Sequence, residues 1–221
     1  MGWFEFALAY IVFFLSHSLP VRPPLRPRLY ALLGASGFTL AYSALSLAVL
    51  AWLIAAAGRA PHVTLWGWAP WQVYVPLTVM GAVCVLLALS IGRPNAFSFG
   101  GARNDLFDPE RPGIVRWSRH PLLAALALWA AAHVVPNGDL AHVMLFGTFA
   151  GFAFFGGRLI DIRKRREMGA EWQRMNVVIK GAPLLAWRWS GTILARLFTG
   201  VFLYATLLWV HPVLFGVSPL P

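Results

Sequence analysis

Six long apolar runs, separated by short polar connections, limit what this chain can fold into more than any other feature. A helix needs about 20 mostly apolar residues to cross the hydrocarbon core of a bilayer. The predicted spans are residues 3–19, 29–57, 71–91, 121–135, 140–160 and 192–217. Only 12% of the residues are charged, too few to cover the surface of a soluble domain. We therefore predict an all-α fold in one domain, residues 1–221: a polytopic integral membrane bundle of about six transmembrane helices.

The basic residues of the connections predict how the chain lies in the membrane. They gather in residues 20–28, 92–119 and 161–190, whereas the two intervening connections carry only Arg59. By the positive-inside rule, the three basic loops are cytoplasmic and both termini are outside, in the inner membrane if the source is bacterial. The net charge of +10 therefore indicates membrane lipid as a partner, and not nucleic acid.

Two histidines within apolar runs are candidate ligands of a metal or haem iron, because polar groups inside a membrane are costly and often functional. His17 lies near the inner end of the first span, and His133 follows three alanines in the fourth. Alternatively, His17 is an interfacial histidine that bonds backbone or headgroups. His133 could instead form a hydrogen bond to another helix.

A basic segment precedes the fourth span. Arg116, Arg119 and His120 lie just before Pro121, which suits the first position of a helix and makes His120 its predicted N-cap. The two arginines and the helix N-terminus could hold an anion such as phosphate or carboxylate. The alternative is anchoring at the membrane interface.

Other polar residues have structural interpretations. Asp161 is placed to pair with Arg165, and Arg196 is long enough to reach the cytoplasmic surface. Gly147 and Gly151 would let helices pack closely within the chain. The lone cysteine, Cys84, excludes an internal disulfide, and no nucleotide-binding or soluble-hydrolase motif is present.

Several segments resemble the NnrU family of membrane proteins. They are Arg119-His120-Pro121, Leu128-Trp129-Ala130-Ala131-Ala132-His133, Asn137-Gly138-Asp139-Leu140, Leu145-Phe146-Gly147, and His17-Ser18-Leu19-Pro20 followed by Arg22 and Arg26. That family is linked to nitrite and nitric oxide metabolism in bacterial denitrification. It also includes the zeta-carotene isomerases of plants and cyanobacteria, which hold a b-type haem through histidines.

The resemblance implies a haem b, with His17 and His133 as the ligands of its iron. At about 1.5 Å per helical residue, however, the two histidines are expected at depths about 11 Å apart. His120 matches the depth of His17 better, but it lies nearly opposite His133 on the same predicted helix. We therefore rank the pair His17 and His133 first, and the pair His17 and His120 second.

Two functions follow from this resemblance. One is a redox-gated cis-trans isomerase acting on a long apolar molecule such as a polyene. The other is an accessory or sensor protein of nitric oxide metabolism. The resemblance does not identify the substrate or the oligomeric state.

A third function rests on a different resemblance. Arg119-His120-Pro121, then Glu167-x-Gly169-x-Glu171-Trp172 and Pro183, are similar to the membrane methyltransferases that modify isoprenylcysteine or phospholipid with S-adenosylmethionine. The pair of adjacent acids that those enzymes carry before the glycine is missing, because Asp161 and Glu167 are separated by basic residues.

Overall fold

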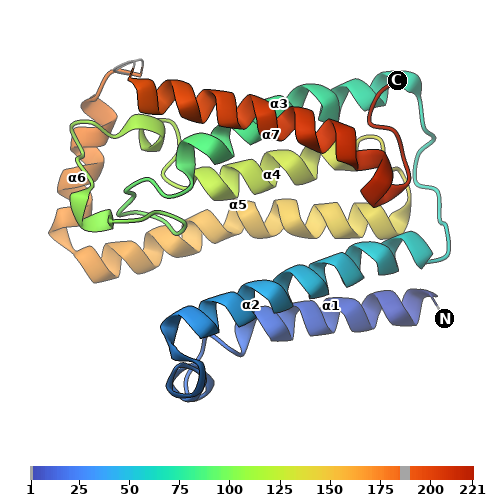
Figure 1. Cartoon of the computed structure of the whole chain (residues 1–221), viewed down its shortest axis with the longest axis horizontal. Helices are drawn as coiled ribbons and strands as arrows, with labels where there is room; N and C mark the ends of the chain where they lie inside the picture. Colours follow the sequence, from blue (N-terminus) through green and yellow to red (C-terminus); the bar gives the residue numbers. More distant parts are fainter. Residues whose placement is uncertain (1, 185–189) are drawn as a thin grey trace. The chain divides into compact units, whose positions relative to one another are not determined.

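The computed structural model describes residues 2–184 and 190–221, and helices are the only extended regular elements among them. The helices are α1 (Gly2–Ser18), α2 (Leu25–Arg59), η1 (Pro70–Val73), α3 (Tyr74–Ser90), η2 (Asn104–Leu106), η3 (Gly113–Arg116), α4 (Pro121–Val134), α5 (Leu140–Met168), α6 (Ala170–Gly181) and α7 (Gly191–Phe215). Figure 1 follows their order from blue to red. The prediction of an all-α fold is confirmed for this part of the chain.

Each of the predicted spans overlaps one helical stretch, and α5 extends to Met168, beyond the predicted end at residue 160. Four helical stretches are long and apolar enough to cross a membrane: α2, Pro70–Ser90, α5 and α7. Helix α1 has 17 residues and α4 has 14. A helix as short as α4 is about 21 Å long, less than the ~30 Å hydrocarbon core. The chain is therefore a multi-pass membrane protein, and six crossings stay a prediction.

The described chain divides into two compact units, which we treat separately. The first contains Met1–Trp66 and Asp139–Leu145. In it, α1 packs along α2, and Arg59 donates to Glu5 at distances of 2.5 and 3.2 Å. This ion pair joins the start of α1 to the end of α2. Helix α2 is kinked at Gly34, whose φ of 69° is the left-handed conformation that glycine adopts without strain.

The second unit contains Gly67–Gly138 and Phe146–Pro221. Helix α3 lies between α4 and α7 and packs against both. A Cβ atom added at Gly200 of α7 would lie 2.7 Å from the Cα atom of Val85 in α3, so this glycine is what lets the two helices approach closely. By contrast, a Cβ atom at Gly147 or Gly151 of α5 would meet no atom of its own unit within 4 Å.

Helix α6 covers the loop between α3 and α4 (Figure 1). Its residues Trp172, Met175 and Ile179 follow one another at helical spacing and are buried against Phe97 and Val115 of that loop. The charged side chains of α6, among them Arg174, are exposed. The two longest polar segments of the sequence are therefore packed against each other around an apolar core of their own.

Candidate functional site

His17 lies in the last turn of α1, in the first unit. Its Nδ1 atom is 2.8 Å from the backbone oxygen of Phe13. A carbonyl oxygen only accepts hydrogen bonds, so Nδ1 carries a proton and donates it to that oxygen. The ring centroid of His17 lies 4.1 Å from that of Phe13. The Tyr42 hydroxyl donates to the backbone oxygen of His17 at 3.1 Å. The ring of His17 is thus held in one orientation by its Nδ1 atom.

His133 repeats this arrangement in α4, in the second unit. Its Nδ1 atom is 2.7 Å from the backbone oxygen of Trp129, which again places the proton on Nδ1. The ring centroids of Trp129 and Phe146 lie 5.6 and 5.3 Å from that of His133. The imidazole therefore contacts two aromatic rings, whose own centroids are 5.3 Å apart. No hydrogen bond of Nε2 is recorded for either His17 or His133 among the described residues.

His120 has a different environment, because both of its ring nitrogens are engaged. Nδ1 is 3.0 Å from Oγ of Ser98, and Nε2 is 3.1 Å from Oδ1 of Asp161. The residue is the N-cap of α4, as predicted, and Pro121 opens the helix. A Cβ atom added at Gly157 of α5 would lie 3.1 Å from the Cδ2 atom of His120, so this glycine leaves the space that the imidazole of His120 occupies.

Arg119 completes this cluster. Its Nε and Nη2 atoms donate to the two carboxylate oxygens of Asp161 at 3.2 and 2.6 Å, and Nη1 donates to Oδ1 of Asn176 at 3.1 Å. This bidentate pairing is the strong form of a guanidinium–carboxylate contact. The guanidinium also lies over the Trp172 ring, 5.5 Å from its centroid. Helices α4, α5 and α6 are thereby joined by one polar network.

The sequence matches the family NnrU, described as NnrU protein, over residues 5–219. The chain belongs to the NnrU family. No curated protein and no solved structure gives a match. The resemblance noted in the sequence is therefore confirmed over nearly the whole chain, and it now includes residues beyond 166, where the motifs are less distinct.

Within this NnrU-family chain, the predicted anion-binding arginines are occupied by protein acceptors. Arg119 faces Asp161 and Asn176, as described above. Arg116 donates from Nε to the backbone oxygen of Ala182 at 2.7 Å, which attaches η3 to the end of α6. Neither contact tests anion binding, but an anion at Arg119 would have to compete with Asp161.

The main participants that sequence reasoning missed in this NnrU cluster are Asn95, Ser98 and Asn176. Asn95 is buried and donates to the backbone oxygen of Arg119 at 3.0 Å. Ser98 is buried as well. Asp161 was expected to pair with Arg165, but that pair is not among the described ion pairs, and Arg165 lies 4.2 Å from the centroid of Trp172. In the sequence, the feature that could have indicated this cluster is the carboxylate of Asp161 at the end of an apolar run.

Burial sets the charge state of His120. It lowers the pKa of the imidazole below its ordinary value, and the charge of Arg119 acts in the same direction. The Asp161 carboxylate opposes this shift and raises the pKa, but to a smaller extent. His120 is therefore neutral near pH 7, with Asp161 accepting from Nε2 and Ser98 donating to Nδ1.

The three candidate histidines are divided between the two units of the chain. His17 and His133 lie in different units, and His120 shares the unit of His133. Among the residues that the structure describes, no three His, Cys, Asp or Glu side chains form a group suited to a bare metal ion. A haem needs less from the protein, because its porphyrin supplies four iron ligands and the chain supplies at most two.

Proposed function

We propose that this NnrU-family protein binds a b-type haem and that His17 and His133 are the ligands of the iron. The observation that carries the proposal is the state of the ring nitrogens. His17 and His133 each bond a backbone carbonyl through Nδ1 and keep Nε2 for a metal, whereas His120 uses both nitrogens within the protein. This contrast favours His133 over His120 as the partner of His17.

The backbone carbonyls have a definite role in this proposal. A hydrogen bond from Nδ1 to a carbonyl holds the imidazole in one orientation and makes Nε2 a stronger donor to a metal. The rings of Trp129 and Phe146 give His133 apolar surroundings that suit a porphyrin. When bound, the haem would supply one-electron redox chemistry.

Absorption spectra of the detergent-purified protein from haem-fed cells test the proposal. We expect the oxidised and dithionite-reduced spectra of a b-type haem in the wild type, and their loss in His17→Ala and in His133→Ala. His120→Ala is the matched control and is expected to keep the spectrum. A colourless wild type, or a spectrum lost only in His120→Ala, would contradict the assignment. Size-exclusion elution shows whether each variant is folded.

Two activities fit such a protein. The first is redox-gated double-bond isomerisation of a long apolar polyene, and the second is an accessory or sensor role in nitrite and nitric oxide metabolism. Turnover of a cis polyene by the reduced protein would support the first. Binding of nitric oxide without polyene turnover would support the second.

The methyltransferase function gains no support from the described contacts. It would need Arg119 for an anionic group of S-adenosylmethionine, whereas this guanidinium pairs with Asp161. The acids of the similar segment are paired too: Glu167 with Lys164 and Glu171 with Arg174. Binding of S-adenosylmethionine that is lost on Arg119→Ala would reverse this ranking.

A further inference from the structure

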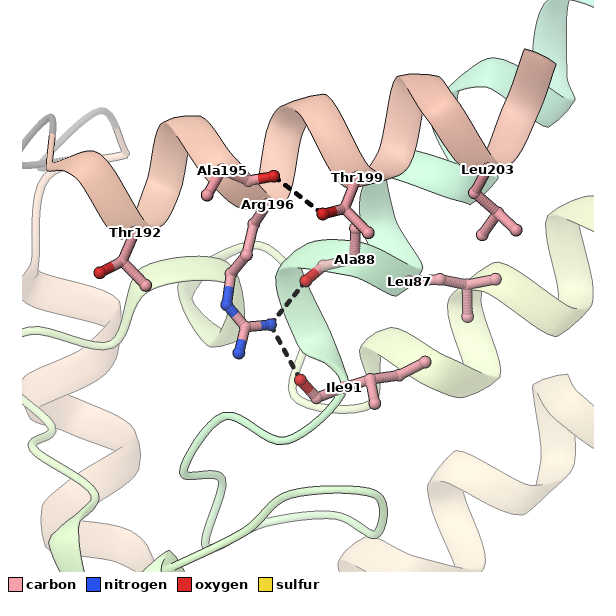
Figure 2. A pocket seen from close by; sticks show the side chains of 8 residues that line it. All are labelled: Leu87, Ala88, Ile91, Thr192, Ala195, Arg196, Thr199 and Leu203. Carbon is pink, nitrogen blue, oxygen red and sulfur yellow. Dashed lines mark hydrogen bonds between the residues drawn. The ribbon is translucent and has the colours of Figure 1, made fainter. Parts of the chain in front are cut away.

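A groove between α3 and α7 lies within the second unit, and none of the histidines discussed above lines it. It has a volume of about 400 Å³ and is lined by Leu87, Ala88, Ile91, Thr192, Ala195, Arg196, Thr199 and Leu203. Figure 2 shows Arg196 extending from α7 toward the C-terminal end of α3. Apart from this guanidinium and two hydroxyls, the side chains of the groove are apolar.

The position of Arg196 is set by the end of α3. Its Nη1 atom donates to the backbone oxygens of Ala88 and Ile91 at 2.6 and 2.9 Å. The last carbonyls of a helix have no partner within the helix and carry partial negative charge, so a guanidinium is well placed there. The contact uses one of the three guanidinium nitrogens. For Nε and Nη2, no acceptor is recorded among the described residues.

A second cation, Arg93, follows two residues after Ile91 in the sequence. Arg93, which is exposed just beyond α3, is the charged group that acts on Arg196, and its charge has the same sign. No carboxylate is recorded as an ion-pair partner of either arginine in the part of the chain that the structure describes. The two like charges repel each other, and an anion close to both would offset that repulsion.

We propose that this groove binds an anionic phospholipid, with the headgroup phosphate at Arg196 and Arg93 and an acyl chain along Leu87 and Leu203. Because the described residues supply no acceptor for Nε and Nη2, these two guanidinium nitrogens suit the bidentate recognition of phosphate. Basic pockets between membrane helices on the cytoplasmic side are typical sites of anionic headgroups. The groove opens next to the loops that the charge pattern places in the cytoplasm, where anionic lipid is found.

Native mass spectrometry of the full chain in detergent tests this site. The probes are dioleoylphosphatidylglycerol, which is anionic, and dioleoylphosphatidylcholine, which is zwitterionic with the same acyl chains. We expect the wild type to bind the anionic lipid more tightly. Arg196→Gln and Arg93→Gln are each expected to weaken that binding about fivefold, since an arginine near an anionic lipid contributes about that factor.

The variants are chosen so that a folding defect cannot hide the result. Arg93→Gln leaves the contact of Arg196 with α3 intact, so it reports on the site even if Arg196→Gln unfolds. Arg174→Gln is the charge-matched control, because Arg174 pairs with Glu171 on the exposed side of α6, and it is expected to bind lipid like the wild type.

Three results would overturn the proposal. The first is equal binding of the two lipids by the wild type. The second is unchanged phosphatidylglycerol binding in folded Arg93→Gln. The third is displacement of phosphatidylglycerol by excess inorganic phosphate, which would identify a site for a soluble anion.

Discussion

At the scale of single residues, the chain uses its histidines in two ways that their sequence positions do not separate. His17 and His133 each donate from Nδ1 to the backbone carbonyl four residues earlier, and the residues that the structure describes supply no partner for Nε2. His120 is bonded at both nitrogens, between Ser98 and Asp161. The first arrangement is suited to a ligand, and the second supports the packing of α4 on α5.

The carboxylate of Asp161 is the centre of the polar network around Arg119 and His120. Asp161→Asn would leave the Arg119 guanidinium without its counter-charge at a site where the two side chains are only 29% and 14% exposed. Removing one partner of a largely buried pair is strongly destabilising, and with partial solvent screening we expect a loss of about 2 kcal/mol. The thermal unfolding midpoint in detergent, followed by tryptophan fluorescence, measures this loss.

The control for this variant is Glu171→Gln. Glu171 also pairs with an arginine, but the pair is exposed on α6 and is expected to contribute nothing measurable. Equal unfolding midpoints for Asp161→Asn and the wild type would show that the network contributes little to stability.

His120 predicts a dependence of stability on pH. Burial holds its pKa below the ordinary value in the folded protein, so the unfolded chain binds more protons on acidification. The contribution of neutral His120 is complete above about pH 6.5 and is lost as the pH falls from there toward the lowered pKa. The unfolding midpoint should therefore fall more steeply between about pH 7 and pH 5 in the wild type than in His120→Gln.

The other histidines are common to both proteins in this comparison, so their titration cancels in the difference between the two profiles. Parallel profiles for the wild type and His120→Gln would mean that His120 keeps an ordinary pKa.

At the scale of elements, close helix packing depends on a glycine that no motif marks. Gly200→Ala would bring a Cβ atom to 2.7 Å from the Cα atom of Val85, so α3 and α7 would have to separate. Overpacking of this kind costs about 1–3 kcal/mol, which lowers the unfolding midpoint.

Gly151→Ala is the matched control, since its Cβ atom would meet no atom of its own unit. Alanine is the better helix former, so this variant is expected to be neutral or slightly stabilising. If Gly200→Ala unfolded at or above the wild-type temperature, the proposed close approach of α3 and α7 would be wrong.

At the scale of the whole molecule, the charge pattern predicts that both termini are outside. In a Cys84→Ala background, a cysteine at His62, between α2 and η1, should react with a membrane-impermeant maleimide in intact cells. A cysteine at Asp105, in the arginine-rich loop 92–119, should react only after the membrane is permeabilised. Both positions are exposed, so access to the reagent depends on the side of the membrane alone.

This labelling pattern requires that the segment between the two positions, which contains α3, crosses the membrane with its N-terminal end outside. Labelling of the Asp105 position in intact cells, with protection of the His62 position, would reverse the orientation. Labelling of both positions would mean that the segment between them does not cross the membrane.

The approximate positions of the long apolar helices, the membrane class and the family could all be predicted from local sequence. Hydropathy over about 20 residues is a local property, so each predicted span could be located without knowledge of its neighbours. The N-cap at His120 was predictable for the same reason, because Pro121 acts on the adjacent residue. The NnrU motifs are likewise contiguous segments that need no tertiary information.

Which polar groups meet could not be predicted from local sequence, because the partners come from distant segments. Arg119 and Asp161 are 42 residues apart in the sequence, and Arg196 reaches a helix end more than 100 residues away. The local rule paired Asp161 with Arg165 because it counts only neighbours on one helix. A bidentate guanidinium from another helix forms a stronger contact in a largely buried place, and its position depends on how α4 and α5 pack. In the same way, the importance of Gly200 follows from the packing of α7 on α3, because the partner helix determines which atoms face a glycine.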